Sequence, residues 1–173
     1  MKKVKIIYVI FLFIFAFISH FVYQLYPNFI TSLFFPVNES IWEHMKIIYT
    51  SFVFGSFFEK FLLKNYNVKY HNFNIEIFVK AFLGIISYLI IYLPLYFLLG
   101  ENIVISIILL LVVYILMEIV GTKILKSDEL NINTLPIITI ILGYFLFFIL
   151  TYYPPHCFLF FDYHQLLYGI KGS

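Results

Sequence analysis

Residues 103–121 read IVISIILLLVVYILMEIVG and carry one charged side chain, Glu118. An apolar run of this kind matches the roughly 20 residues that a helix needs to cross a bilayer. The rest of the chain agrees with it, because 63% of its 173 residues are hydrophobic and 12% are charged, whereas soluble domains carry about 25% charged residues. The sequence therefore predicts an all-α integral membrane protein.

Further apolar stretches extend on both sides of residues 103–121. The predicted transmembrane helices are residues 4–26, 41–63, 75–99, 103–121 and 134–153. Five crossings account for nearly the whole chain, so we predict a single membrane domain, residues 1–173, with no separate soluble domain. Residues 27–37 and 157–170 are apolar but too short to cross, which is typical of segments that lie in the membrane interface.

The placement of the lysines predicts the orientation of this bundle. Eight lysines lie on one side of the predicted bundle, namely Lys2, Lys3, Lys5, Lys60, Lys64, Lys69, Lys123 and Lys126. Lys46 and Lys171 fall on the opposite side. Because basic residues concentrate on the cytoplasmic side, we expect a cytoplasmic amino terminus and, after five crossings, an extracytoplasmic carboxyl terminus.

Charge and cysteine content exclude several classes of function. The formal net charge is +2, which is too balanced to indicate a nucleic-acid partner. All basic residues are lysines, so no site has a bidentate guanidinium group. Cys157 is the single cysteine, which excludes an intrachain disulfide and a zinc site built from several thiolates. Any metal would be held by histidines and carboxylates.

The predicted orientation gathers histidines and acids at the outer face. The ionisable side chains expected there are His20, His44, His156, His164, Glu39, Glu43, Glu101 and Asp162. Ionisable groups at or inside a bilayer are costly and are by default candidates for function. Segments near residues 20, 40 and 160 are therefore expected to form one outer site.

The densest part of this site is residues 34–49, FFPVNESIWEHMKIIY. Ser40 and Glu43 have the spacing of a capping box, in which each side chain binds a free backbone amide at a helix start. Lys46 is expected to reach outward or to pair with a carboxylate such as Glu39 or Asp162.

A second pair of charges is expected at the cytoplasmic end. Lys80 and Glu118 lie near that boundary on neighbouring antiparallel helices. Since an unpaired charge at this depth costs a few kcal/mol, an ion pair is predicted.

Two motifs carry a resemblance to a known family. PVNESIWEHMK and a later PPH, followed by an aspartate and Tyr-Gly-Ile, are similar to an uncharacterised family of small bacterial multi-pass membrane proteins, classed as a domain of unknown function. The matching positions are His20, Tyr23, Asn38, Glu39, Ser40, Trp42, Glu43, His44, Lys46, Pro154, Pro155, His156, Asp162, Tyr168 and Gly169. His164 falls where this chain departs from the pattern. The resemblance implies a bacterial cytoplasmic membrane and an outer-face site, without an activity.

The first functional interpretation is a metal-dependent hydrolase that acts on a lipid-like substrate. Its metal ligands would be His20, His44 and His156, and zinc is the expected metal, because catalytic zinc takes three protein ligands and keeps one open position. Either Glu39 or Glu43 would be the general base. Asp162 would accept an imidazole N–H from a ligand.

Two other interpretations stay open. The same outer pocket suits a small transporter, or a substrate-binding subunit, for a metal ion or polar solute; a haem between His20 and His44 is a related possibility. Alternatively, the polar residues form a hydrogen-bonded network in a structural or assembly subunit. Polar side chains that would serve any of these sites are Asn38, Ser40, Lys46 and Tyr168.

Overall fold

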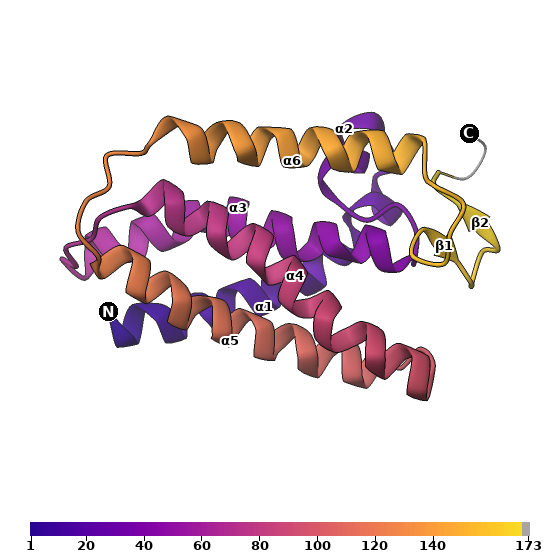
Figure 1. Cartoon of the computed structure of the whole chain (residues 1–173), viewed down its shortest axis with the longest axis horizontal. Helices are drawn as coiled ribbons and strands as arrows, with labels where there is room; N and C mark the ends of the chain where they lie inside the picture. The colour runs from indigo at the N-terminus through magenta and orange to yellow at the C-terminus, as the bar shows by residue number, and fades with distance from the viewer. Residues whose placement is uncertain (171–173) are drawn as a thin grey trace.

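A computed structural model describes residues 1–170. Its helices are α1 (Lys2–Leu25), α2 (Phe29–Phe34), α3 (Ile41–Asn65), α4 (Phe73–Leu99), α5 (Ile103–Lys126) and α6 (Thr134–Tyr152), followed by strands β1 (Phe161–Asp162) and β2 (Leu167–Tyr168) (Figure 1). The five long helices coincide with the five predicted ones, and the largest difference is that α5 continues beyond Gly121 to Lys126. The helical fold class is therefore confirmed.

The long helices pack around α3. This helix contacts α1, α4 and α6, while α5 contacts both α1 and α4. In Figure 1, α6 runs along one side of the bundle and α1 and α5 along the other. The short helix α2 and the two strands lie at one end, and the α3–α4 and α5–α6 connections lie at the opposite end beside the amino terminus.

The outward surface of the bundle is apolar. Large aliphatic side chains point away from it on α1, α5 and α6, with Ile10 56% exposed, Ile108 59% and Ile141 61%. Within residues 1–170, four helices are long and apolar enough to cross a membrane, namely α1, α4, α5 and α6. An apolar exterior of this kind is what a lipid environment requires.

Helix α3 differs from the other long helices because it contains several polar side chains that face inward. Glu43, Lys46, Thr50, Ser51 and Glu59 are all buried. They interrupt the apolar pattern, so α3 does not meet the same requirement by length and composition. Glu43, Lys46 and Glu59 are instead surrounded by other parts of the chain, while Lys60 and Lys64 near the end of α3 are exposed.

The segment after α6 folds back over the end of the bundle. Strands β1 and β2 pair antiparallel, with Phe161 opposite Tyr168. Gly169 follows with φ +62°, and a Cβ there would lie 2.7 Å from the Thr151 carbonyl oxygen. A glycine suits both conditions. The backbone N–H of Trp42 donates to the Leu159 carbonyl at 2.8 Å, which ties the tail to α3.

The structure also defines the two segments expected at the membrane interface. Residues 27–37 contain α2, whose first turn is capped by the Asn28 side chain. Residues 157–170 form turns and the β1–β2 pair rather than a helix. Lys171, which belongs to the predicted outer lysines, lies outside the described residues.

Candidate functional site

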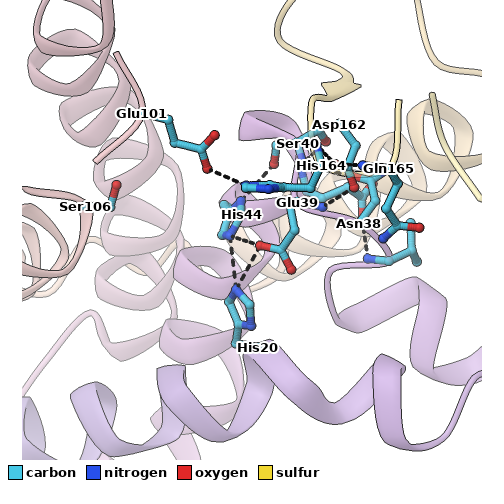
Figure 2. A network of polar contacts seen from close by, with 12 residues as sticks. His20, Asn38, Glu39, Ser40, His44, Glu101, Ser106, Asp162, His164 and Gln165 are labelled. Carbon is cyan, nitrogen blue, oxygen red and sulfur yellow. Dashed lines mark hydrogen bonds and ion pairs between the residues drawn. The ribbon is translucent and has the colours of Figure 1, made fainter. Parts of the chain in front are cut away.

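Three ligand-type side chains meet at the end of the bundle that carries α2 and the tail. His20 lies near the end of α1, His44 lies in the first turn of α3, and Glu39 lies in the loop just before α3. The two imidazole Nε2 atoms are 3.2 Å apart. Glu39 Oε2 lies 3.4 Å from Nε2 of His20 and 3.3 Å from Nε2 of His44. Figure 2 shows all three side chains pointing at one another. We call them the His20–Glu39–His44 site.

The backbone around α3 sets the orientation of two of these groups. His44 Nδ1 lies 2.9 Å from the Ser40 carbonyl oxygen, to which it donates its proton, because a carbonyl only accepts. This bond fixes the tautomer, so the lone pair of Nε2 points into the site when the imidazole is neutral. The backbone N–H of Glu39 donates to Asp162 Oδ2 at 2.9 Å, which anchors the loop that carries the carboxylate.

The third group has a less complete set of partners. His20 Nδ1 is buried and has no hydrogen-bond partner among residues 1–170. The His20 ring packs edge-on against Phe21. This imidazole is therefore oriented by the contacts of its Nε2 with His44 and Glu39 and by packing against Phe21, without a partner for Nδ1.

The site is partly open to its surroundings. The side chains of His20, His44 and Glu39 are 28%, 30% and 41% exposed. When their Nε2 atoms carry protons, hydrogen bonds from His20 and His44 hold the pKa of the Glu39 carboxyl well below its ordinary value. Glu39 is therefore an anion at neutral pH, and it faces two imidazole nitrogens.

The three atoms have the spacing of metal ligands. In a tetrahedral site with bonds of 2.0–2.1 Å, neighbouring ligand atoms lie about 3.3–3.4 Å apart. The three observed distances, 3.2–3.4 Å, match one face of such a tetrahedron. Two imidazoles and one carboxylate are also a ligand set of catalytic zinc. A haem between His20 and His44 does not fit, because Glu39 occupies the space where a porphyrin would lie.

The other acid predicted as a general base, Glu43, lies in a closed network next to this site. Its Oε2 lies 2.8 Å from Lys46 Nζ and accepts the Val37 backbone N–H at 3.0 Å. Its Oε1 accepts the Thr151 hydroxyl at 2.7 Å. Both oxygens are thus engaged and the side chain is 2% exposed, so Glu43 joins α3 to α6 and to the preceding loop.

The structure tests two details of the predicted helix start. Lys46 pairs with a carboxylate, as predicted, but this carboxylate is Glu43 and not Glu39 or Asp162, and the ammonium group also donates to the Ser32 carbonyl. Of the predicted capping box, the Ser40 half is present, since its hydroxyl accepts the Glu43 N–H at 3.3 Å. The other half is absent, because the Ser40 N–H donates to Asn38 Oδ1 instead.

Asp162 and Asn38 hold the tail against the loop before α3. Besides Glu39, Asp162 accepts the backbone N–H groups of His164 and Gln165 at 2.7 and 2.9 Å. Asn38 donates to the Gly169 carbonyl at 2.8 Å. Asp162 therefore binds backbone amides, whereas the sequence predicted an imidazole partner. These contacts are drawn in Figure 2.

His156, the third predicted ligand, is not part of the His20–Glu39–His44 site as the structure places it. Among residues 1–170, the groups of ligand atoms close enough to share a metal do not include it. Its ring stacks on Tyr168, with centroids 4.5 Å apart. The two rings line an open hollow of about 560 Å³ with Tyr152, Tyr153 and Pro154.

The sequence did not predict one pair beside the site. His164 Nε2 lies 3.3 Å from Glu101 Oε1, at the connection between α4 and α5. In Figure 2 the side chains of Glu101 and His164 point toward each other above His44, Glu101 from the helix side and His164 from the tail. Both residues were expected at the outer face, but no spacing rule links a loop residue to one in the tail.

The predicted pair at the other end is confirmed, and it belongs to a larger group. Lys80 Nζ lies 2.8 Å from Glu118 Oε1. Lys5, Glu59 and Glu76 join this pair. The sequence contains one signal for the addition, because Glu76 and Lys80 are four residues apart on one helix and therefore share a face.

Comparison with known proteins identifies a family but no characterised relative. The model of a family of unknown function, DUF6512, matches residues 1–170. The chain belongs to this family, which confirms the resemblance to an uncharacterised one. No curated protein and no solved structure matches the chain.

Proposed function

We propose that the protein is a membrane-embedded metalloenzyme whose His20–Glu39–His44 site binds zinc and hydrolyses a lipid-like substrate at the outer face. The observation that carries the proposal is the triangle of two imidazole nitrogens and one carboxylate oxygen, with sides of 3.2–3.4 Å. The ligand types and their spacing both suit zinc, and the fourth tetrahedral position would be free for water.

The proposal includes the predicted topology of five crossings with the amino terminus in the cytoplasm. Helix α3 has 25 residues, which is about 37 Å of helix and enough to cross the roughly 30 Å hydrocarbon core. Glu43, Lys46 and Glu59 are buried and the exposed Lys60 and Lys64 lie near its end, so a lipid environment does not exclude it. The lysine-rich connections would then lie in the cytoplasm, and the resemblance supports a bacterial cytoplasmic membrane.

The position of the site suggests the substrate class. His20 and His44 lie on the ends of helices whose flanks are apolar, including Phe21, which is 48% exposed. A ligand that reaches the site along this flank has an apolar part in the membrane and a polar part beside the imidazoles. A lipid or a lipid-like molecule has this character.

The residues around the site divide the chemical roles. Zinc at this position would lower the pKa of bound water toward about 7. Glu43 is unsuitable as the general base because both its oxygens are engaged with partners. Glu101, which is paired with His164 and is 46% exposed, is the better acid–base candidate. Asp162 would act by positioning the loop that carries Glu39.

The test is the metal content of the detergent-purified protein and of matched histidine variants. We expect about one zinc per chain after incubation with zinc, and its loss in His20→Ala and His44→Ala. His156→Ala is the control and should keep its zinc. The sequence predicted His156 as a third ligand, whereas the structure places it outside the site. Zinc-free wild-type protein, or zinc retained by His44→Ala, would contradict the proposal.

The hydrogen bonds around the site also support a structural function. The His44→Ala variant distinguishes this function from that of an enzyme. Asp162, Asn38 and Glu43 together hold the tail, the loop before α3 and α6 through at least five hydrogen bonds. If this network is the purpose of the polar residues, His44→Ala lowers the thermal stability of the metal-free protein. If the site binds metal, His44→Ala leaves the metal-free stability nearly unchanged and removes the stabilisation by zinc.

A further inference from the structure

Five charged side chains from four helices meet at the end of the bundle opposite the His20–Glu39–His44 site. They are Lys5 of α1, Glu59 of α3, Glu76 and Lys80 of α4, and Glu118 of α5. Glu59, Glu76 and Lys80 are 0% exposed, and Lys5 and Glu118 are 7% and 4% exposed. We call these residues the five-charge cluster. In Figure 1 the parts of the four helices that carry it lie near the amino terminus.

Each ammonium group in the cluster contacts all three carboxylates. Lys80 Nζ lies 2.6 Å from Glu59, 2.6 Å from Glu76 and 2.8 Å from Glu118. Lys5 Nζ contacts Glu59, lies 3.0 Å from Glu76 and lies 2.8 Å from Glu118. Two contacts of each lysine are hydrogen bonds, from Lys5 to Glu59 and Glu76 and from Lys80 to Glu59 and Glu118. The third contact of each lysine is an ion pair. The two ammonium groups also occupy the space between the carboxylates, where a divalent metal would have to lie.

The carboxylate oxygens are not equally engaged. Glu59 and Glu118 each present one oxygen to Lys5 and the other to Lys80. Glu76 presents Oε1 to both lysines. Its Oε2 is buried and has no hydrogen-bond partner within residues 1–170. Glu118 Oε2 also accepts no hydrogen bond there, but it forms the 2.8 Å ion pair with Lys5.

A second polar group faces the cluster without a partner. Tyr8 of α1 is 0% exposed, and its hydroxyl has no hydrogen-bond partner in the described part of the chain. Lys80 Nζ lies 4.7 Å from the centroid of its ring, so the side chain borders the cluster. A buried carboxylate oxygen and a buried hydroxyl that both lack partners indicate that the cluster needs a further proton or ion.

The charges of the cluster do not balance. Three carboxylates and two ammonium groups leave one negative charge on side chains that are almost fully buried. An uncompensated charge in a membrane interior costs several kcal/mol. One proton removes this cost, and the free oxygen of Glu76 is the atom with room to accept it, because every other carboxylate oxygen already faces an ammonium group.

We propose that the five-charge cluster is a proton-binding site that holds one proton on Glu76. The charged groups that face Glu76 are Lys5 from α1, Glu59 from α3, Lys80 from its own helix and Glu118 from α5, and Tyr8 of α1 lies beside Lys80. Proton binding converts the carboxylate of Glu76 to a carboxylic acid and leaves two carboxylates opposite two ammonium groups. Because the cluster connects four helices, gain or loss of this proton changes the attraction between them.

The test is infrared spectroscopy of the purified protein in detergent at pH 7. A protonated carboxyl has a C=O stretching band well separated from the bands of carboxylates, and we expect such a band with the intensity of about one group per chain. Glu76→Gln, which imitates the neutral acid, should lose this band and retain the thermal stability of the wild type. Glu101→Gln, at the other end of the bundle, is the control and should retain the band.

Two results would overturn the proposal. The first is the absence of an acid band in wild-type protein at pH 7, which needs no variant. The second is a wild-type stability that rises when sodium chloride replaces choline chloride while that of Glu76→Gln does not, since this would assign the free oxygen to a sodium ion. The proposal does not depend on zinc at the opposite end, so the two can fail separately.

Discussion

The His20–Glu39–His44 site and the five-charge cluster lie at opposite ends of the same two helices. On α1, Lys5 and His20 are fifteen residues apart, and on α3, His44 and Glu59 are also fifteen residues apart, which is about 22 Å along a helix. The first site is partly exposed and contains two imidazoles, whereas the second is buried and contains two ammonium groups. The same pair of helices thus carries an accessible group of ligands at one end and a closed group of charges at the other.

The difference between the two sites follows from the basic residue in each. A neutral imidazole presents a lone pair, so two of them beside Glu39 leave a site that a cation completes. An ammonium group has no lone pair and compensates carboxylates itself. Lysines therefore close the buried end, whereas histidines leave the other end able to take a ligand.

The largest expected effect is the loss of an ammonium group from the closed end. Lys80→Met leaves three buried carboxylates with one lysine, so the free energy of unfolding should fall by about 3–5 kcal/mol. Thermal denaturation in detergent measures this effect. Lys123→Met, which removes an exposed lysine of α5 at the same end of the bundle, is the matched control. A Lys80→Met protein as stable as this control would contradict the comparison.

The next effect concerns the accessible end and its response to pH. An imidazole must be neutral to bind metal, because a protonated nitrogen has no lone pair, while the lowered pKa of Glu39 keeps that group ionised. Zinc affinity should therefore fall by about 10- to 100-fold from pH 7.5 to 5.5, since protons compete with zinc for the two imidazole nitrogens. Zinc titrations at several pH values measure this change, and His156→Ala should follow the same curve. An affinity that does not depend on pH would argue against two histidine ligands.

A smaller effect tests how tightly the closed end is packed without changing its charge. A Cβ at Gly121 would lie 2.5 Å from Glu76 Oε1 and 3.0 Å from Lys80 Cδ. Gly121→Ala should therefore lower the free energy of unfolding by about 1–3 kcal/mol, with zinc binding at the opposite end unchanged. Ile119→Ala, which alters a 53% exposed side chain on the same helix, serves as control. Equal stabilities of the two variants would show that the cluster has room to adjust.

The smallest effect is expected for the exposed pair beside the accessible end. Glu101 and His164 are 46% and 63% exposed, and exposed pairs contribute about 0–1 kcal/mol. Glu101→Gln should change the thermal stability by no more than this amount. A double-mutant cycle with His164→Ala measures the pair directly. A coupling energy well above 1 kcal/mol would place these residues in the framework that supports the site.

The helices were predictable because each follows from local sequence. The apolar runs set their lengths, and the predicted Lys80–Glu118 pair followed from depth and helix order alone. The partners of Lys46 were not predictable. The sequence suggested Glu39 or Asp162, but the structure pairs Lys46 with Glu43, whose other oxygen is held by Thr151 from α6. That contact depends on how α6 packs against α3, which cannot be read from the hydrophobic pattern of the sequence.

The ligand set shows the same limit. His20 and His44 were predicted together because both lie at helix ends at the same predicted depth. The position of each residue along its helix was enough for this prediction. His156 satisfies the same criterion, yet Pro154 and the β1–β2 pair direct the tail so that its ring stacks on Tyr168 instead. Glu39 was predicted as a base, and the hydrogen bond between its backbone and Asp162 brings it among the ligand atoms.

By itself, the sequence determined long helices, most of them apolar enough to cross a membrane, with polar groups at two levels along them, because hydrophobic length and charge placement act along one axis, that of the helices. The tertiary structure alone decided which polar groups at each depth meet, because that depends on the rotation of each helix about its axis and on the path of the tail. Rotation brings Lys5 and Glu59 to the Lys80–Glu118 pair. The path of the tail brings Asp162 to Glu39 and takes His156 elsewhere.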